Sequence, residues 1–250
     1  MIKKMKSAAI IQARMTSVRL PGKVLMDIEG QPMLKHVINR LKYSKKLNEI
    51  ILAIPDAKES DILEKFAKDN SVKYFRGSEK DVLSRYYEAA KKFNCDIIAR
   101  ITSDCPLTDP QIVDITIEEY LKSGADYASN RLEMTFPRGL DVEIFSYGVL
   151  KEDYRNSREP YQREHVTPYI YEHPEIFHLC NIEAKGNIKR PEVRLTVDTE
   201  DDFKLIKEVY RRLHRDGKIF YIKGIIDLLN SHPELLKIND HVKQKPMIET

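Results

Sequence analysis

The stretch that decides the fold lies near the N-terminus and reads AIIQARMTSVRLPGK over residues 9–23. It starts within an apolar run, residues 8–11, which predicts a buried first strand. A polar loop with a Pro-Gly turn follows, and it carries three cations: Arg14, Arg19 and Lys23. From about Pro32, apolar residues recur at helical spacing. In open α/β folds, a strand that ends in a basic loop before a helix is a common way to bind phosphates.

The same loop also fits a solvated surface turn, because isolated cations are common in a chain with 32% charged residues. Its spacing matches neither the P-loop, G-x-x-x-x-G-K-[ST], nor the dinucleotide-binding G-x-G-x-x-G. The loop and the helix alone therefore leave phosphate binding open.

The composition is that of a globular chain. Its 250 residues can form one large α/β domain or two small ones. The 42% apolar content excludes a disordered chain, and a net charge of +3 with interspersed signs argues against a nucleic-acid binder. We find neither an apolar stretch long enough for membrane insertion nor a secretory signal. Three cysteines without C-x-x-C spacing fit reduced thiols, so we expect a cytoplasmic protein.

Strands and helices alternate in the first half of the chain. We expect strands at residues 49–53, 72–75 and 96–101, and helices at residues 60–70, 80–93 and 109–123. In the helix over residues 60–70, the apolar face carries Ile62, Leu63, Phe66 and Ala67. Such alternation predicts βαβ units, and hence an α/β fold with a Rossmann-like, mixed but mainly parallel sheet flanked by helices.

The second half is less regular from Tyr127 onward. We expect strands at residues 127–130, 140–146, 176–182 and 192–197, and helices at residues 200–215 and 224–230. The chain is read as a single domain, residues 1–250, with a smaller strand-containing insertion over residues 127–190. The polar tail, residues 239–250, is expected to be frayed.

Two carboxylates, Asp104 and Asp198, come just past predicted strands. Ligands of open α/β sheets gather outside the carboxyl ends of the strands, so both side chains can face one crevice. Such a pair, completed by phosphate oxygens, suits Mg²⁺. The structural alternatives are a cap of the following helix for Asp198 and a turn residue before Pro106 for Asp104.

Further motifs extend the first stretch: FRGS at 75–78, RITSDCPL at 100–107, PRGLDVE at 137–143 and RLTVDT at 194–199. With IQAR and RLPGK of the first stretch, they resemble the sugar-activating cytidylyltransferases, which make CMP-activated sialic acids and ketodeoxyoctonate. The nearest branch is the spore-coat polysaccharide cytidylyltransferase-like family. The resemblance spans about residues 7–215, with the motifs in the family's order.

This resemblance implies a nucleotide-diphospho-sugar transferase type of fold and a nucleotidyltransferase activity. CTP and Mg²⁺ would activate an acidic sugar or sugar phosphate, forming a CMP- or CDP-linked product and pyrophosphate for surface polysaccharide or glycoconjugate synthesis. It also implies a homodimer, with residues 127–190 serving dimerisation and acceptor binding.

The resemblance also assigns residues. Asp104 and Asp198 would hold the metal, and Arg14, Arg19 and Lys23 would cradle the triphosphate. Ala13 and Asp104 are further candidates for nucleotide binding. Arg14 and Lys23 are the candidates for the β- and γ-phosphates, and with the two acids they form the catalytic set.

Candidates for the remaining contacts have structural alternatives. Gly77 and Ser78 are candidates for the base, but Ser78 to Asp81 also matches a capping box of the next helix. The acceptor candidates are Arg100, Arg138 and His165. Arg138 precedes an ordinary alternating strand pattern, and a histidine such as His165 is often a satisfied partner inside a fold.

Two other functions remain open. A glycosyltransferase of similar topology usually carries a D-x-D metal motif, and none occurs here. A catalytically silent nucleotide-binding protein would bind CTP, or nothing, without turnover. The sequence does not name the acceptor.

Overall fold

The computed structural model describes residues 5–215 and 217–245. Within these residues one sheet has the order β5-β4-β1-β6-β8-β7-β9. Its strands are β1 (Ser7–Gln12), β4 (Glu49–Pro55), β5 (Lys73–Gly77), β6 (Ile97–Thr102), β7 (Tyr127–Ser129), β8 (Glu143–Ser146) and β9 (Leu179–Asn181). Only β8 runs antiparallel to its sheet neighbours. A separate antiparallel pair joins β2 (Asp27–Ile28) and β3 (Gln31–Pro32). The predicted mixed, mainly parallel sheet is confirmed.

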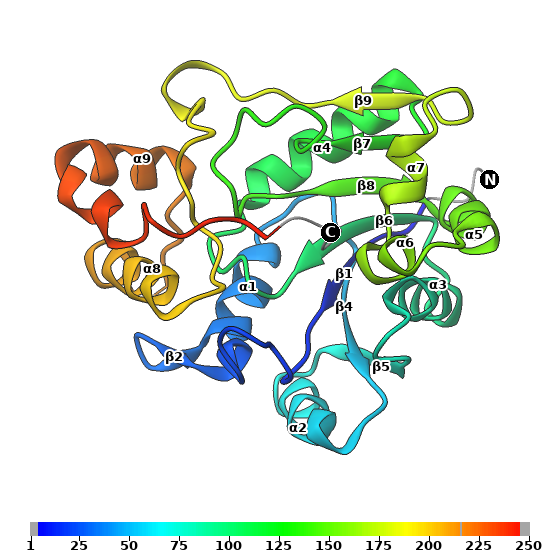
Figure 1. Cartoon of the computed structure of the whole chain (residues 1–250), viewed down its shortest axis with the longest axis horizontal. Coiled ribbons are helices and arrows are strands. Elements are labelled where there is room, and N and C mark those ends of the chain that lie inside the picture. Colours follow the sequence, from blue (N-terminus) through cyan, green and yellow to red (C-terminus); the bar gives the residue numbers. More distant parts are fainter. Residues whose placement is uncertain (1–4, 216, 246–250) are drawn as a thin grey trace.

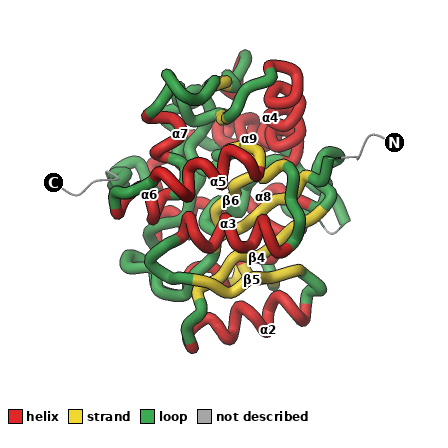
Figure 2. The backbone as a smooth tube through the Cα atoms, turned by 90° about the vertical axis from the view of Figure 1, so that its right-hand side faces the viewer, coloured by secondary structure: helices red, strands yellow, loops and turns green. Residues whose placement is uncertain are grey.

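Helices cover both faces of this sheet (Figures 1 and 2). They are α1 (Met33–Leu41), α2 (Asp61–Asp69), α3 (Val82–Lys92), α4 (Pro110–Ser123), α5 (Tyr147–Asn156), α6 (Pro160–His165), α7 (Pro168–Glu172), α8 (Glu200–Leu213) and α9 (Ile222–Ser231). Short 3₁₀ segments include η1 (Lys23–Leu25), η2 (Lys58–Ser60), η3 (Gly186–Ile188) and η4 (Pro233–Ile238). Because the central strands are buried on both faces, β1 reads as a nearly continuous apolar run.

The alternation of side chains along the central strands divides the core into two layers. Ile11 of β1 points into a cluster with apolar residues of α1, α2, α4, α8 and α9. Its neighbour Ile10 points into the opposite cluster, with α3, α5 and α7. Full burial of one such side chain stabilises the fold by about 1.5–3 kcal/mol. These two layers hold β1 and β6 rigidly, and the carboxyl ends of both strands reach the cavity described below.

The expected last strand, residues 192–197, is wrong as a strand of the sheet. Its only β-bridge among the described residues is an isolated one, between Arg194 and Arg138. The Arg138 N–H donates to the Val193 carbonyl at 2.9 Å, and the Leu195 N–H donates to the Arg138 carbonyl at 2.7 Å. These backbone groups are satisfied by the loop before β8, so the segment does not join the sheet edge.

Other expectations also need correction. Ile62 is 50% exposed, because α2 packs on the sheet only through the narrower stripe of Leu63, Phe66 and Ala67. The strand expected from residue 140 begins at Glu143. Helices α5, α6 and α7 were not expected, although their starts carry recognisable signals: a Ser146 cap, and prolines in the first turns of α6 and α7.

The part of the chain expected as an insertion, residues 127–190, adds β7, β8 and β9 to the same sheet and places α5 and α6 against α3. The three cysteines are free thiols. In residues 5–215 and 217–245, none of the helices combines the length and apolar character needed to cross a bilayer.

Candidate active site

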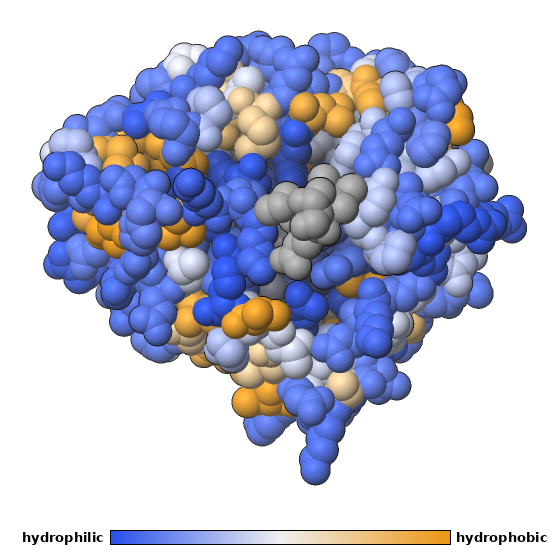
Figure 3. All heavy atoms as spheres, in the orientation of Figure 1, coloured by the Kyte–Doolittle hydropathy of each residue, from blue (hydrophilic) through white to orange (hydrophobic). Residues whose placement is uncertain are grey.

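A cavity of about 870 Å³ opens where β1 and β6 end. Figure 3 shows this face of the molecule hollowed near its centre, with mostly hydrophilic side chains around the hollow. The basic lining residues are Arg14, Arg19, Lys23, Arg85, Arg100, Arg131, Arg138 and Lys245, and the acidic ones are Asp104, Asp141, Glu159, Glu164 and Asp198. Cations outnumber carboxylates, and the volume is that of a small-molecule site, so the cavity suits an anionic ligand.

The basic loop of the first stretch, residues 13–22, forms one wall of this cavity. The Ala13 N–H donates to the Ala53 carbonyl at 3.2 Å, which continues the β1–β4 pairing by one residue. Gly22 closes the loop in the left-handed conformation, with φ of 71°, and its N–H donates to the Met15 carbonyl at 2.9 Å. This closure places Lys23 at the start of η1, where its side chain is only 9% exposed.

Lys23 connects the two carboxylates singled out in the sequence. Its Nζ lies 3.2 Å from Asp104 Oδ2 and 2.9 Å from Asp198 Oδ1, and it also donates to the Val197 carbonyl at 2.6 Å. Burial by itself would lower the pKa of Lys23, but Asp104 and Asp198 raise it above its ordinary value. Lys23 is therefore a fixed cation, and the two acids, separated by more than ninety residues in the chain, meet at one point.

Asp198 reaches Asp104 through backbone pairing rather than from the end of a strand. The Val197 N–H donates to the Asp104 carbonyl at 2.8 Å, and the Thr196 hydroxyl contacts the same carbonyl at 3.3 Å. Asp198 is not the cap of the next helix, because Thr199 holds that position at the start of α8. Burial would raise the pKa of the Asp198 carboxyl, but Lys23 and its arginine neighbours hold it below its ordinary value.

Arginine contacts orient the Asp198 carboxylate. Arg19 Nη2 and Arg194 Nη2 each lie 2.8 Å from Asp198 Oδ2, while Lys23 takes the other oxygen. Arg194 is itself locked by Asp202, with its Nε 2.9 Å from Asp202 Oδ1. The carboxylate thus has a defined orientation toward the cavity.

The donor set fits a divalent cation only in part. Within the described residues, no group of three or more His, Cys, Asp or Glu side chains is arranged to hold a metal ion. The acid pair, Asp104 and Asp198, nevertheless directs one oxygen each to within about 3 Å of a single cationic atom, Lys23 Nζ. Two carboxylates completed by phosphate oxygens and water are what Mg²⁺ accepts, so the pair fits a metal that arrives with a phosphate ligand.

Arg14 and Arg85 form the end of the cavity next to the basic loop. Arg14 is exposed and has no hydrogen bond or ion pair within residues 5–215 and 217–245. Arg85, on α3, is only 2% exposed, and its Nη1 donates to the Ser78 carbonyl at 2.5 Å. Its Nε is buried and has no hydrogen-bond partner among the described residues. Burial lowers the pKa of Arg85 to about 10, and repulsion from Arg14 adds to this lowering. An unneutralised buried guanidinium here favours a ligand oxygen as its partner.

Gly77 and Ser78, the base candidates, are not among the residues that line the cavity. The Ser78 hydroxyl accepts from the Asp81 N–H at 3.0 Å, but the cap of α3 is Asp81, which accepts from the Ser84 N–H at 2.9 Å. The alternative of a capping box that starts at Ser78 is therefore met only in its hydroxyl contact, since the helix cap lies three residues later. Ser78 contacts the cavity indirectly, through its carbonyl and Arg85.

The opposite end of the cavity is lined by Arg100 of β6 and by Arg131, Arg138 and Asp141 of the loop before β8. Arg100 is buried and ion-paired with Glu143, which also lies 3.3 Å from Arg131 Nη1. Arg138 has no side-chain hydrogen bond or ion pair to any described residue, and burial, with repulsion from Arg131 and Arg194, lowers its pKa. Both arginines were candidates for binding the acceptor substrate. Arg100 is already ion-paired with Glu143, whereas Arg138 is available to a ligand.

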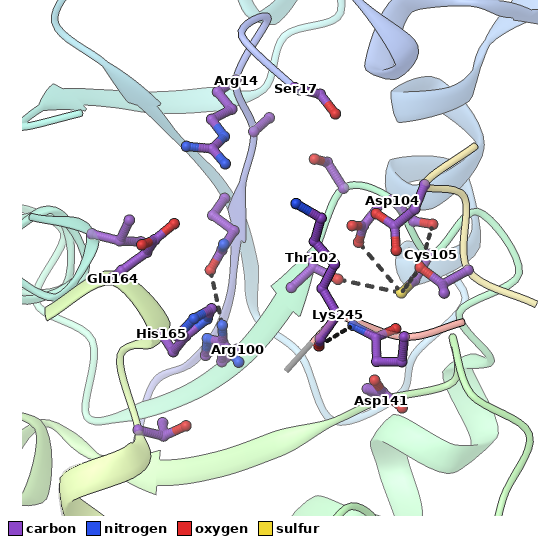
Figure 4. Close-up of a pocket in the computed structure, with 18 of the residues that line it drawn as sticks. Arg14, Ser17, Arg100, Thr102, Asp104, Cys105, Asp141, Glu164, His165 and Lys245 are labelled. Atoms are coloured by element: carbon purple, nitrogen blue, oxygen red, sulfur yellow. Dashed lines mark hydrogen bonds between the residues drawn. The ribbon is translucent and has the colours of Figure 1, made fainter. Parts of the chain in front are cut away.

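His165 borders the same end, in a strained turn. The Thr167 N–H donates to the His165 carbonyl at 3.0 Å, and Val166 between them has φ of 75° and ψ of −55°. This is the rare γ-turn with positive φ, costly for a β-branched residue. The turn brings both His165 and Thr167 to the cavity wall (Figure 4 labels His165).

Several residues of the site escaped the sequence analysis, among them Arg85, Arg131, Arg194, and the pair Gln244 and Lys245 near the C-terminus. Arg85 had a signal, since it interrupts the apolar stripe of α3 between Val82 and Ala89. Gln244 and Lys245 belong to the tail expected to be frayed, yet they line the cavity; residues 246–250 of that tail lie outside the described residues.

Comparisons with known proteins bear on this site. A cytidylyltransferase family model matches residues 8–228. The uncharacterized protein MJ1063 of Methanocaldococcus jannaschii is 43% identical over 241 residues, covering 96% of this chain and 97% of the relative. The spore coat polysaccharide biosynthesis protein SpsF of Bacillus subtilis is 33% identical over 230 residues, covering 90% and 94%.

Solved structures agree in fold. A cytidylyltransferase from Leptospira borgpetersenii superposes with a TM-score of 0.89 at 33% identity, covering 97% of this chain and all of that one. A CMP:2-keto-3-deoxy-manno-octonic acid synthetase, solved in complex with CTP, has a TM-score of 0.63 at 19% identity and covers 83% of this chain and 99% of its own. The second likeness shows the fold alone.

Proposed function

The chain belongs to the cytidylyltransferase family, a family of nucleotidyltransferases, and from this premise we propose that it transfers the CMP group of CTP to an acidic sugar or sugar phosphate. An oxygen of the acceptor attacks the α-phosphorus, the bond from that phosphorus to the β-phosphate oxygen breaks, and pyrophosphate leaves. A sugar hydroxyl gives a CMP-linked product and loses its proton, whereas a sugar phosphate gives a CDP-linked product.

One observation carries the proposal: Lys23 Nζ lies within 3.2 Å of both Asp104 and Asp198 at the wall of a cationic cavity. Phosphoryl transfer asks little covalent help from a protein, and most of its rate comes from positioning and charge neutralisation. Buried Lys23 and half-buried Arg19 are held in place by Asp198, so they are cations that need not reorganise when a triphosphate binds. Arg14 adds a more exposed cation on the same loop.

Asp104 and Asp198 would hold a divalent cation that arrives with the triphosphate. When bound, such an ion neutralises charge on the phosphates and on the reacting phosphoryl group. The chain's own contribution is orientation: Arg194 and Asp202 fix the Asp198 carboxylate, and the Val197 N–H ties it to the Asp104 backbone.

Arg138 and His165 are the acceptor candidates. Arg138 presents a guanidinium without a carboxylate partner among the described residues, and such a group meets a carboxylate or phosphate through parallel hydrogen bonds. His165 borders the same end and is the candidate to take the proton of an attacking hydroxyl. The CTP complex of the structural neighbour and the polysaccharide role of the Bacillus relative support CTP and a sugar acceptor. Homodimer formation and a cytoplasmic location remain predictions.

The test is a pyrophosphate-release assay that crosses four nucleoside triphosphates with a panel of acidic sugars and sugar phosphates, with Mg²⁺ or with EDTA. We expect release with CTP, one acceptor class and Mg²⁺. Asp104→Asn and Asp198→Asn should lower kcat by about 10²-fold or more. Asp69→Asn is the matched control, because Asp69 pairs with Lys65 on the exposed side of α2 and does not line the cavity.

Melting temperatures must accompany these rates, because Asp198 also anchors three cations. CTP binding without turnover with any acceptor would favour the silent nucleotide-binding protein. Release independent of both carboxylates would refute the proposed chemistry.

A further inference from the structure

The C-terminal segment over residues 239–245, here called the strap, is docked against the site. At its first residue, the Asn239 side-chain amide donates to the Arg194 carbonyl at 3.2 Å and to Asp202 Oδ1 at 2.8 Å. Asn239 is 4% exposed. Near its other end, Gln244 Oε1 accepts from Arg194 Nη1 at 2.9 Å. Both anchors reach Arg194, and between them His241 Nε2 of the strap lies 3.2 Å from Asp201 Oδ2.

Arg194 also links the strap to the acid pair. Its Nε and Nη2 contact Asp202, its Nη2 contacts Asp198 at 2.8 Å, and its Nη1 contacts Gln244. All three nitrogens of this guanidinium are therefore used, and only the contact at Nη1 comes from the strap. The arrangement is a built connection from Asp198 to residue 244, not a chance approach of an exposed tail.

Gln244 and Lys245 then line the cavity. In Figure 4 the Lys245 side chain extends past Thr102 toward the side where Ser17 and Asp104 lie, and away from Asp141. Lys245 thus brings a cation to the phosphate side of the cavity from a wall other than that of the basic loop. A triphosphate carries several negative charges, whereas Lys23 and Arg19 already share theirs with Asp104 and Asp198. A further cation on another side is what such a ligand needs.

We infer that the strap is part of the substrate site: Lys245 contacts a phosphate oxygen of the bound nucleotide, and Gln244 holds it there through Arg194. The inference rests on the proposed function for the identity of the nucleotide. What it claims of Lys245 is only that it binds a polyphosphate. The strap completes a binding site that the basic loop, β6 and the segment before α8 form only in part.

The test compares Lys245→Ala with Lys243→Ala in the full chain. Lys243 is the matched control, because it lies on the same strap, is exposed and does not line the cavity. Dissociation constants are measured by titration calorimetry with Mg²⁺-CTP and with Mg²⁺-inorganic triphosphate. We expect Lys245→Ala to weaken both ligands by about 3- to 10-fold, with the difference shrinking as salt rises, and Lys243→Ala to stay within about 2-fold.

Gln244→Ala tests the connection. It leaves Lys245 in the chain, so we expect an intermediate loss, of about 2- to 5-fold, with an unchanged melting temperature. If Lys245→Ala binds both ligands as tightly as Lys243→Ala, or more tightly, the inference is overturned. Weakening of CTP but not of inorganic triphosphate would also overturn it, since the contact would then not be to phosphate.

These outcomes are separate from a failure of the proposed function. If the chain binds triphosphate through Lys245 but releases no pyrophosphate with any acceptor, the inference about the strap stands and the proposed transferase function is refuted. A chain that binds neither ligand would reject both.

Discussion

Gly139 is the position at which one added carbon should disturb the acid pair from a distance. Its φ is 101°, and a Cβ at this residue would lie 2.5 Å from the Thr196 nitrogen, 2.6 Å from the Leu195 carbonyl carbon and 2.8 Å from the Leu195 carbonyl oxygen. All three are backbone atoms, so a rotamer change cannot relieve the contact. The Gly139→Ala chain must separate the loop before β8 from residues 195 and 196.

The cost has two parts. An L-residue at strongly positive φ costs about 1–2 kcal/mol, and forcing extra volume against packed backbone costs about 1–3 kcal/mol. Together they amount to about 2–5 kcal/mol, which for a chain of this size lowers the melting temperature by about 4–20 °C. Because Val197 ties this segment to the Asp104 carbonyl, the shift should also move Asp198 and Arg138. A displacement near 1 Å would lower kcat/KM by about 10- to 100-fold.

Gly124→Ala separates the cost of the positive φ from the cost of the close backbone contact. Gly124 ends α4 with φ of 65°, but no atom of the described part of the chain lies within 4 Å of its added Cβ, so only the conformational cost remains. We expect about 1 kcal/mol, or about 2–4 °C, and normal activity. Calorimetric melting and the pyrophosphate-release assay, run well below both melting temperatures, compare the two variants. Equal melting temperatures, or an undiminished kcat/KM for Gly139→Ala, would refute the close-approach reasoning.

Arg85→Met removes a buried guanidinium that lacks a carboxylate partner among the described residues. We therefore expect the melting temperature to stay the same or rise, while the Kd for CTP increases about 10-fold. A parallel loss of stability in calorimetry would mean that Arg85 is structural. Burial raises the pKa of Asp153 to about 8, so its stabilising contribution is complete below its ordinary pKa of 3.8 and is lost as the pH rises to about 8. Asp153→Asn should therefore melt progressively higher than the unaltered chain between pH 5 and 8, and a constant difference would contradict this. The pKa of Asp198 is lowered instead, so its contribution to the stability of the fold is present at neutral pH and is lost as the pH falls below about 3.8. The stability of Asp198→Asn, followed by circular dichroism during acid unfolding, should therefore depend less on pH in that range.

Much of the fold could be predicted from local pattern. The apolar run before Gln12 is buried on both faces as β1, and the spacing of Met33, Leu34, Val37 and Ile38 became the buried face of α1. Burial of apolar surface is a property of each element, so its period is written into a short window of sequence. The apolar pattern did not predict α5, α6 and α7. The starts of these helices carry a cap residue or a proline instead.

The site could be predicted only in part, because its side chains come from the ends of elements. Lys23, Asp104 and Asp198 were singled out by their places after expected strands, yet Asp198 follows no strand of the sheet. Arg100 and Arg138 looked equivalent in sequence, and only the structure distinguishes them, since Arg100 is ion-paired with Glu143 whereas Arg138 forms no ion pair with a described residue.

By itself, then, the sequence determined the central strands of the sheet, most helices and the loop that carries Arg14, Arg19 and Lys23, because burial and turn chemistry act over a few residues. Only the tertiary structure decided that residues 193–197 pair with Arg138 and Asp104 instead of joining the sheet, and that residues 239–245 fold back onto Arg194. Those placements depend on hydrogen bonds between segments about 45 to 95 residues apart, and no local period records which backbone group will meet which.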